Sequence, residues 1–137
     1  MQQYTEADGE HVVRVSASDL ARMTWDLPHI GDPGYTRAIA RGVRARSASL
    51  GVAVVPIGQG SPKHDSDADH LFLGLKGRVV FRVDAHDHEL GVMDVLYIPA
   101  GRYYEYWNAS FQQALFVDVL ARVDGWPPSG NYEPIGS

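Results

Sequence analysis

A chain of 137 residues with 45% hydrophobic content is long enough for one domain with a buried core, and too short to expect two. Its net charge of -5 is a poor match to phosphate-rich partners, which bind clustered Lys and Arg, so we expect no nucleic-acid partner. Because the chain has no cysteine, disulfides, thiolate nucleophiles and Cys-ligated zinc or iron–sulfur sites are excluded.

The first ten residues are polar and acidic, and the chain contains no run of eighteen apolar residues. A signal peptide needs an apolar centre and a membrane helix needs a long apolar run. We therefore expect no membrane association, and a cytoplasmic location is the default.

The N-terminal region carries the signals of one short helix. Ser16, Ser18 and Asp19 are N-cap candidates before a short apolar stripe, and Pro28 ends any helix soon afterwards. We expect one or two helical turns within an N-terminal arm over residues 1–34.

From residue 35 onward, short runs rich in Val, Ile, Leu, Phe and Tyr recur between Gly, Pro or Asp. The runs are Tyr35–Arg41, Ser49–Ile57, Leu71–Leu75, Arg78–Val83, Val92–Ile98, Tyr103–Trp107 and Ala114–Leu120. Seven short strands at this spacing are typical of an all-β sandwich or barrel. We assign this domain to residues 35–123.

One run predicts a hairpin with a polar tip. Val79, Phe81 and Val83 alternate with Arg78 and Arg82, which is the pattern of a half-buried strand. The stretch 84–89 that follows is polar, and we interpret its His-x-His pair as part of a solvated turn rather than a metal site.

The tail, residues 124–137, cannot extend a sheet because Pro127 and Pro128 lack the backbone N–H that a ladder needs. We expect it to lie along the surface, held there by Trp126.

The densest polar cluster in the chain lies just before the run 71–75. Two histidines and three aspartates fall within residues 64–70. The polar positions lie between two glycines. Five residues separate Gly58 from His64, one separates His64 from Ser66, three separate Ser66 from His70, and six separate His70 from Gly77.

A second set of spaced residues follows further along the chain. A second known motif has a Gly, a Pro, a Gly, a His and an Asn at fixed spacing. The residues at these positions are, in order, Met93, Pro99, Gly101, Tyr104 and Asn108. With both motifs in register, the span 58–108 resembles the cupin family. Ser66 and His70 replace a His and a Glu of the first motif, while Met93 and Tyr104 replace a Gly and a His of the second.

The resemblance implies an antiparallel jelly-roll β-barrel whose two sheets enclose a pocket open at one end. Cupins usually hold a divalent metal with three His and one Glu, and only His64 keeps its expected type here. His64, His70 and Tyr104 are therefore candidate ligands for a divalent transition metal such as iron, zinc, manganese or nickel. The alternative is that the same three residues form a metal-free pocket with acid/base chemistry.

Alternation along two strands predicts the rest of the pocket. If position 104 faces inward, so do positions 106 and 108, and if position 70 faces inward, so do 72 and 74. Gly74 would then leave room for a ligand. The candidate pocket residues are Ser66, Phe72, Tyr106 and Asn108. Aromatic walls with a few polar groups suit a small cyclic or planar organic molecule.

Two functions remain open at this stage. The first is a small-molecule enzyme of lyase, isomerase, cyclase or oxygenase type in which His64, His70 and Tyr104 act as catalytic groups or metal ligands. The second is a non-catalytic ligand-binding or sensing cupin. Lys63 and Arg102 stand next to the motif positions, where they could attract an anionic group. We also expect a homodimer, formed through the N-terminal arm or the Arg-bearing run 37–46.

Overall fold

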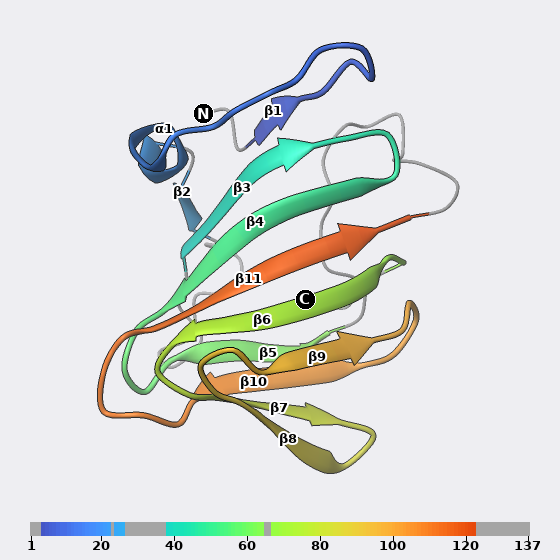
Figure 1. Ribbon diagram of the computed structural model, residues 1–137. Coiled ribbons are helices and arrows are strands. Elements are labelled where there is room, and N and C mark those ends of the chain that lie inside the picture. Colours follow the sequence, from blue (N-terminus) through green and yellow to red (C-terminus); the bar gives the residue numbers. More distant parts are fainter. Residues whose placement is uncertain (1–3, 23, 27–37, 65–66, 123–137) are drawn as a thin grey trace.

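The computed structural model describes residues 4–22, 24–26, 38–64 and 67–122, which form two β-sheets (Figure 1). The larger sheet has seven strands in the order β1-β3-β4-β11-β6-β9, with β2 also paired to β3. Its strands are β1 (Tyr4–Glu6), β2 (Thr24–Asp26), β3 (Ala38–Arg44), β4 (Ala48–Val55), β6 (Asp69–Lys76), β9 (Val95–Ile98) and β11 (Ala114–Ala121). The smaller sheet has the order β5-β10-β7-β8. Its strands are β5 (Gly60–His64), β7 (Val79–Val83), β8 (His86–Leu90) and β10 (Tyr104–Asn108).

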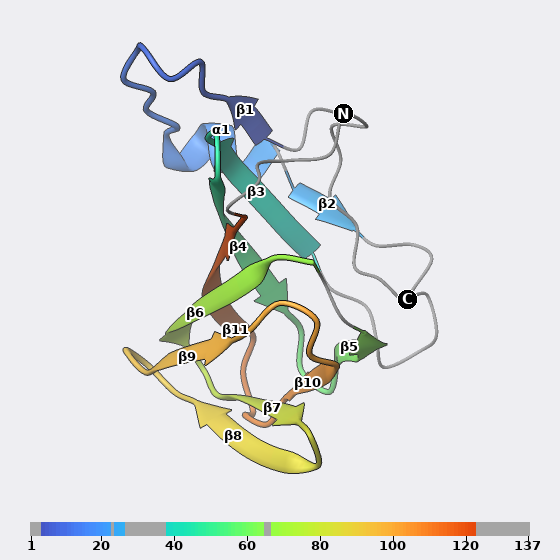
Figure 2. The ribbon, with the colours of Figure 1, turned by 90° about the vertical axis from the view of Figure 1, so that its right-hand side faces the viewer.

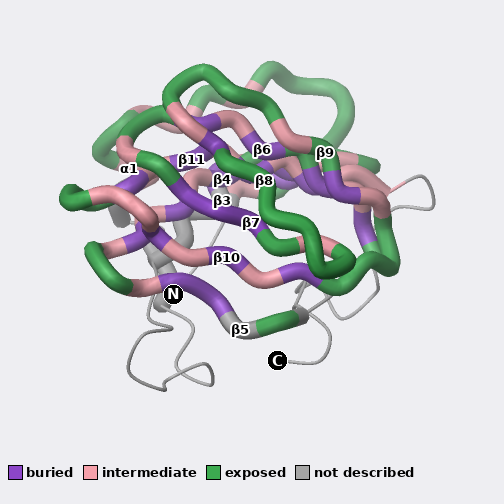
Figure 3. Tube along the Cα trace, turned by 90° about the horizontal axis from the view of Figure 1, so that it is seen from below, coloured by how far each residue is buried: buried purple, intermediate pink, exposed green. Residues whose placement is uncertain are grey.

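Aromatic rings from both sheets meet between them. Phe72 of β6 lies 4.7 Å from Phe81 of β7, and Phe116 of β11 lies 5.4 Å from Tyr106 of β10, measured between ring centroids. Buried and partly buried residues alternate along β10 and β11, so each strand presents one face to this core (Figure 3). The sheets are held together by side-chain packing across the gap.

The predicted closed barrel is wrong. No ladder of backbone hydrogen bonds joins the larger sheet to the smaller one among the described strands, and their edges stay separate (Figure 2). The all-β class and the antiparallel arrangement of the central strands are as predicted, but the architecture is an open sandwich of two sheets. Loops join the sheets where a barrel would have continuous pairing.

Most of the predicted strands are present. Every predicted run from residue 49 to residue 120 overlaps a strand, and β3 overlaps the run 35–41, of which residues 35–37 lie outside the described part. The sequence did not predict β1, β2, β5 or β8. In β5 and β8 the composition is mostly polar, so these strands depend on their neighbours β10 and β7 for pairing.

The β7–β8 hairpin is tighter than predicted. Its turn consists of Asp84 and Ala85, whose φ angles of 50° and 66° are those of a two-residue hairpin turn of the primed kind. His86 and His88 therefore lie on strand β8, paired with Val83 and Phe81, and both are exposed. Within the polar stretch 84–89, residues 84–85 form the predicted polar tip and residues 86–89 belong to strand β8.

The N-terminal arm contains the six-residue helix α1 (Ala17–Arg22). The Ser16 hydroxyl accepts a hydrogen bond from the Asp19 backbone N–H at 3.1 Å, while Asp19 accepts one from the Ser16 backbone N–H at 3.3 Å. This reciprocal pair is a capping box. None of the helices in the described ranges is long and apolar enough to cross a membrane. The predicted surface tail, with Trp126, lies outside the described residues.

Met93 occupies a backbone conformation that favours glycine. Met93 lies in the turn before β9, has a φ of 68° and is 70% exposed. The cupin motif has a glycine at this position. Residues with a Cβ atom are strained in the left-handed region, whereas glycine is not. This explains why the family motif has a glycine at this position.

We predict that Met93→Gly raises the free energy of unfolding by about 0.5–1 kcal/mol, because relief of left-handed strain outweighs the greater freedom of the unfolded chain. Urea unfolding measures the change. Val92→Gly is the matched control: Val92 is also exposed but has no positive φ, so this variant is expected to lose stability. A loss of stability in Met93→Gly equal to that of the control would contradict the prediction.

Asp8 organises the loop of the N-terminal arm. Its carboxylate accepts hydrogen bonds from the backbone N–H groups of Glu10 at 2.8 Å and His11 at 2.9 Å, and it contacts Nδ1 of His11 at 2.6 Å. These bonds, with the backbone bond from His11 the largest cause, lower the pKa of Asp8 from 3.8 to about 2. The charged carboxylate is therefore the form that the loop stabilises.

Because the pKa of Asp8 is lower in the folded chain, its hydrogen bonds contribute fully above pH 3.8 and are lost as the pH falls through about 2. We predict that the carboxyl carbon of Asp8 titrates near pH 2 in an NMR titration, and that the amide of His11 shifts with it. Titration of Asp8 near its ordinary value of 3.8, with no response at His11, would show that the loop does not hold in solution.

Candidate active site

His70 lies inside the sandwich on strand β6. Its residue is only 4% exposed, and its ring stacks on that of Phe72 at a centroid distance of 5.2 Å. The alternation of β6 turns His70 and Phe72 toward the core, as the sequence predicted for this strand. A histidine placed among apolar neighbours needs a polar partner.

That partner is Asp118 on the neighbouring strand β11. His70 Nδ1 lies 3.1 Å from Oδ1 of Asp118, and both side chains are largely buried. An ionised carboxylate only accepts hydrogen bonds, so with Asp118 ionised Nδ1 of His70 is the donor of this bond. Asp118 thereby fixes both the orientation and the tautomer of His70.

The sequence reasoning missed Asp118, although a signal was present. Asp118 is the only polar residue in the apolar run Ala114–Leu120, and it falls on the same alternating face as Phe116 and Leu120. A charged residue on the core face of a central strand is expensive unless it has a partner. That pattern could have identified it as a functional or pairing residue.

Tyr104 brings the second sheet to the same place. It is buried on β10, with its ring edge-on to that of His70 at 5.5 Å between centroids and 6.0 Å from Phe72. Two of the three predicted reactive residues thus lie side by side, although they come from opposite sheets. The third, His64, lies on β5, where its backbone is paired with that of Tyr104.

The predicted pocket residues have different environments. Ser66 lies outside the described residues. Phe72 and Tyr106 are buried in the ring cluster: Phe72 contacts Phe116 at 5.4 Å, and Tyr106 contacts Phe81 at 5.1 Å, between centroids. Phe72 also contacts His70 directly, so its position affects the site through that ring.

Asn108 supports the loop after β10. Its Nδ2 donates to the backbone carbonyls of Val55 at 3.0 Å and Gln112 at 2.7 Å. Its Oδ1 accepts hydrogen bonds from the backbone N–H and the hydroxyl of Ser110. These bonds tie the β10–β11 connection to β4, which accounts for an asparagine here without a ligand.

The expected ligand space at Gly74 is not present. A Cβ atom at this position would lie 2.0 Å from the backbone oxygen of Gly91, so the prediction was wrong. Gly74 donates its N–H to the carbonyl of Asp94 at 3.0 Å and accepts from Met93 at 2.9 Å. Close approach of the backbone before β9, rather than a ligand, requires glycine.

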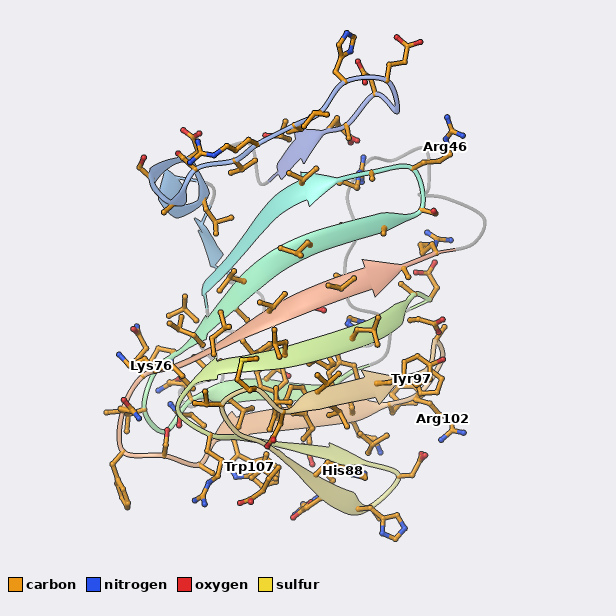
Figure 4. The ribbon with its side chains drawn as sticks, viewed as in Figure 1. Arg46, Lys76, His88, Tyr97, Arg102 and Trp107 are labelled. Carbon is orange, nitrogen blue, oxygen red and sulfur yellow. The ribbon has the colours of Figure 1, made fainter. Side chains whose placement is uncertain are left out.

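The cations near the motifs are paired within the chain. Arg102, labelled in Figure 4, forms an ion pair with Asp84. Lys63 lies 5.8 Å above the ring of Tyr103. Lys63 borders an outer hollow of about 320 Å³. Its lining residues are Lys63, Arg82, Asp84, Ala85, Tyr103 and Glu105.

Arg82, in the same hollow, is held by acidic neighbours. Its Nε bonds to Asp87 at 2.8 Å, Glu105 lies 3.8 Å away, and its guanidinium lies 5.2 Å from the ring of Trp107. The hydrogen bond to Asp87 raises the pKa of Arg82 and lowers that of Asp87. Acidic partners therefore offset much of the positive charge at this hollow.

A family model for the cupin domain matches residues 51–120, just over half of the chain. The chain belongs to the cupin family. This cupin is also similar in structure to the cupin domain of Cnp3 from Schizosaccharomyces pombe, at 22% identity over 63% of this chain and 61% of that one, with a TM-score of 0.60. A search of curated proteins found no match.

Two further structures share the fold. A predicted oxalate decarboxylase from Thermotoga maritima has 14% identity over 81% of this chain and 100% of its own, with a TM-score of 0.69. The protein TT1209 from Thermus thermophilus has 24% identity over 66% of this chain and 87% of its own, with a TM-score of 0.59. At these identities the similarity establishes the fold and not the activity.

The His70–Asp118 pair is compatible with a single metal ligand at His70. A metal-binding histidine usually donates its other ring N–H to a carboxylate, which is the arrangement at His70. Within the described ranges, the three ligand-type side chains that lie within 4.8 Å of one another are Asp8, Glu10 and His11, all exposed on the arm. That group is far in sequence from the cupin motifs and does not include His70.

We predict that Asp118→Ala lowers the free energy of unfolding by about 2 kcal/mol, because it leaves Nδ1–H of His70 buried without this acceptor. Chemical denaturation measures the loss. The double variant His70→Phe/Asp118→Leu removes both polar groups and is expected to recover most of it. A single variant as stable as the wild type, or a double variant no better than Asp118→Ala, would contradict the buried pair.

Proposed function

We propose that this cupin is an enzyme acting on a small organic molecule, with His70 as its central reactive group. The observation that carries the proposal is the buried His70–Asp118 pair beside Tyr104. A packed core has no need of such a pair for stability, since apolar residues of similar volume would serve as well. Departures from an apolar core, such as a buried polar pair, are found mainly at functional sites.

Each residue has a defined role in the proposal. Asp118 holds the proton on Nδ1 of His70, so that Nε2 is the nitrogen that accepts or donates a proton during the reaction. The hydroxyl of Tyr104 polarises an oxygen of the substrate in this proposal. Without metal, these groups support lyase, isomerase or cyclase chemistry, which needs only proton transfer and polarisation.

In a metal-loaded form, His64, His70 and Tyr104 would hold a divalent transition ion such as iron, zinc, manganese or nickel. Such an ion supplies Lewis acidity, and a redox-active one adds oxygenase chemistry. Asp118 would then orient His70 as a ligand. In both forms Asp118 would accept a hydrogen bond from Nδ1 of His70.

A second candidate is a non-catalytic cupin that binds or senses a ligand. The dense ring packing around His70 favours it, because Phe72, Phe81, Tyr106 and Phe116 are all buried. In this alternative, His70 and Tyr104 are groups that recognise a ligand without catalysing a reaction.

The test incubates the purified chain with a metabolite extract and follows depletion and product formation by mass spectrometry. Small carboxylates such as oxalate are added, since one structural neighbour is a predicted oxalate decarboxylase. Metal content is measured on the same preparation. We expect turnover that falls at least a hundredfold in His70→Gln and about tenfold or more in Tyr104→Phe.

The matched control is His88→Gln, which changes an exposed histidine on β8 and should keep full turnover. Circular dichroism establishes that each variant is folded. Undiminished turnover in folded His70→Gln would overturn the proposal. A wild-type chain that retains a small molecule unchanged, and loses it in His70→Gln, would establish the ligand-binding alternative.

A further inference from the structure

The hollow bordered by Lys63 lies on the outer face of the smaller sheet. Glu105 of β10 and Arg82 of β7 both line it, and these two residues are direct partners in the register. Their neighbours along the strands, such as Tyr104 and Tyr106, are buried in the core. Because side chains alternate along a strand, Glu105 and Arg82 face away from the core. The hollow is therefore separate from the candidate active site.

The walls of this hollow are shaped by two backbone features. Strand β5 has one extra residue opposite Glu105, where the register with β10 shifts, and this is a β-bulge. Bulges re-aim the side chains beside them, and Lys63, at this bulge, lines the hollow. The tight β7–β8 turn lines it through Asp84, which an ion pair with Arg102 holds in place.

The described lining residues carry no net charge. Lys63 and Arg82 supply two positive charges, and Asp84 and Glu105 supply two negative ones. Arg82 lies 3.8 Å from Glu105, and Asp84 is paired with Arg102. A charged ligand would lose hydration here and would have to compete with these ion pairs. The hollow therefore favours an uncharged ligand.

The polar groups of the lining also require a ligand that both donates and accepts hydrogen bonds. The carboxylates of Asp84 and Glu105 accept, while the ammonium of Lys63 and the guanidinium of Arg82 donate. A hydroxyl group does both. Neighbouring hydroxyls on one molecule can therefore bond to a carboxylate and to the cation beside it, as the pair Glu105 and Arg82 would need.

Tyr103 adds an apolar surface to the same hollow. Its residue is 49% exposed, and the ammonium of Lys63 lies 5.8 Å from its ring centroid. One face of a sugar ring consists mainly of C–H groups, so it can pack on an aromatic ring while the hydroxyls reach polar groups around it. The volume of about 320 Å³ is at the small end of small-molecule sites, which suits a ligand of one or two rings.

We propose that this hollow binds an uncharged, hydroxyl-rich small molecule of the sugar class. One face of its ring packs on Tyr103, and its hydroxyls bond to Glu105 and Arg82 at the floor and to Lys63 and Asp84 at the walls. The site does not depend on the reaction proposed for His70, because the two lie on opposite faces of the smaller sheet.

The test titrates the nitrogen-15-labelled full chain with glucose, galactose, mannose, maltose and cellobiose, and follows the backbone amides by NMR. We expect saturable shifts at Tyr103, Glu105 and Arg82 with at least one sugar. The dissociation constant should be on the order of 1 mM, because a small open site gains few contacts. Tyr103→Ala should weaken binding roughly tenfold, whereas Tyr103→Phe keeps the ring and should bind like the wild type.

Phe111→Ala is the matched control, since Phe111 is an exposed aromatic residue in a loop outside the hollow, and it should leave binding unchanged. The amide spectrum of each variant establishes that it is folded. No saturable shift with any sugar would overturn the proposal, as would shifts confined to residues around His70. Stronger binding of acetate or glycine than of every sugar would show that the ligand is ionic, and undiminished binding by Tyr103→Ala would rule out the stacked ring.

Discussion

The packing of aromatic rings between the two sheets is the constraint on which the rest of this structure depends. Phe72 and Phe116 extend from the larger sheet, Phe81 and Tyr106 from the smaller, and their rings meet at 4.7 to 5.6 Å. Each ring buries on the order of 200 Å² of apolar surface, far more than any single polar contact contributes. This cluster sets the separation of the sheets, and it thereby places His70 beside Tyr104 although the two residues come from different sheets.

Within that apolar setting, the pair formed by His70 and Asp118 is costly. Burying a carboxylate requires partners that compensate the lost hydration, and apolar side chains on β6 and β11 would stabilise the sandwich as well or better. The pair therefore makes sense as chemistry rather than as packing. It also links the two candidate forms of the site, because a carboxylate that fixes the tautomer of a histidine serves an acid/base group and a metal ligand alike.

The apolar runs and the two spaced motifs were enough to predict the family and the central strands. The polar strands β5 and β8 were not predictable, because their pairing comes from β10 and β7 and not from their own composition. Gly74 was wrongly predicted to leave room for a ligand. The backbone of Gly91 excludes a side chain at Gly74, and this contact between residues distant in sequence could not be predicted. Asp118 was overlooked although its isolation in an apolar run was visible.

The central claim is that Asp118 holds the proton on Nδ1 of His70 and so makes Nε2 the reactive nitrogen. Nitrogen-15 NMR of the imidazole, with the His70 resonances assigned by comparison with His70→Gln, measures this directly at a pH where the ring is neutral. The account predicts a protonated Nδ1 and an unprotonated Nε2 in the wild type, with this preference weakened in Asp118→Ala. A ring that carries its proton on Nε2 in the wild type would contradict it.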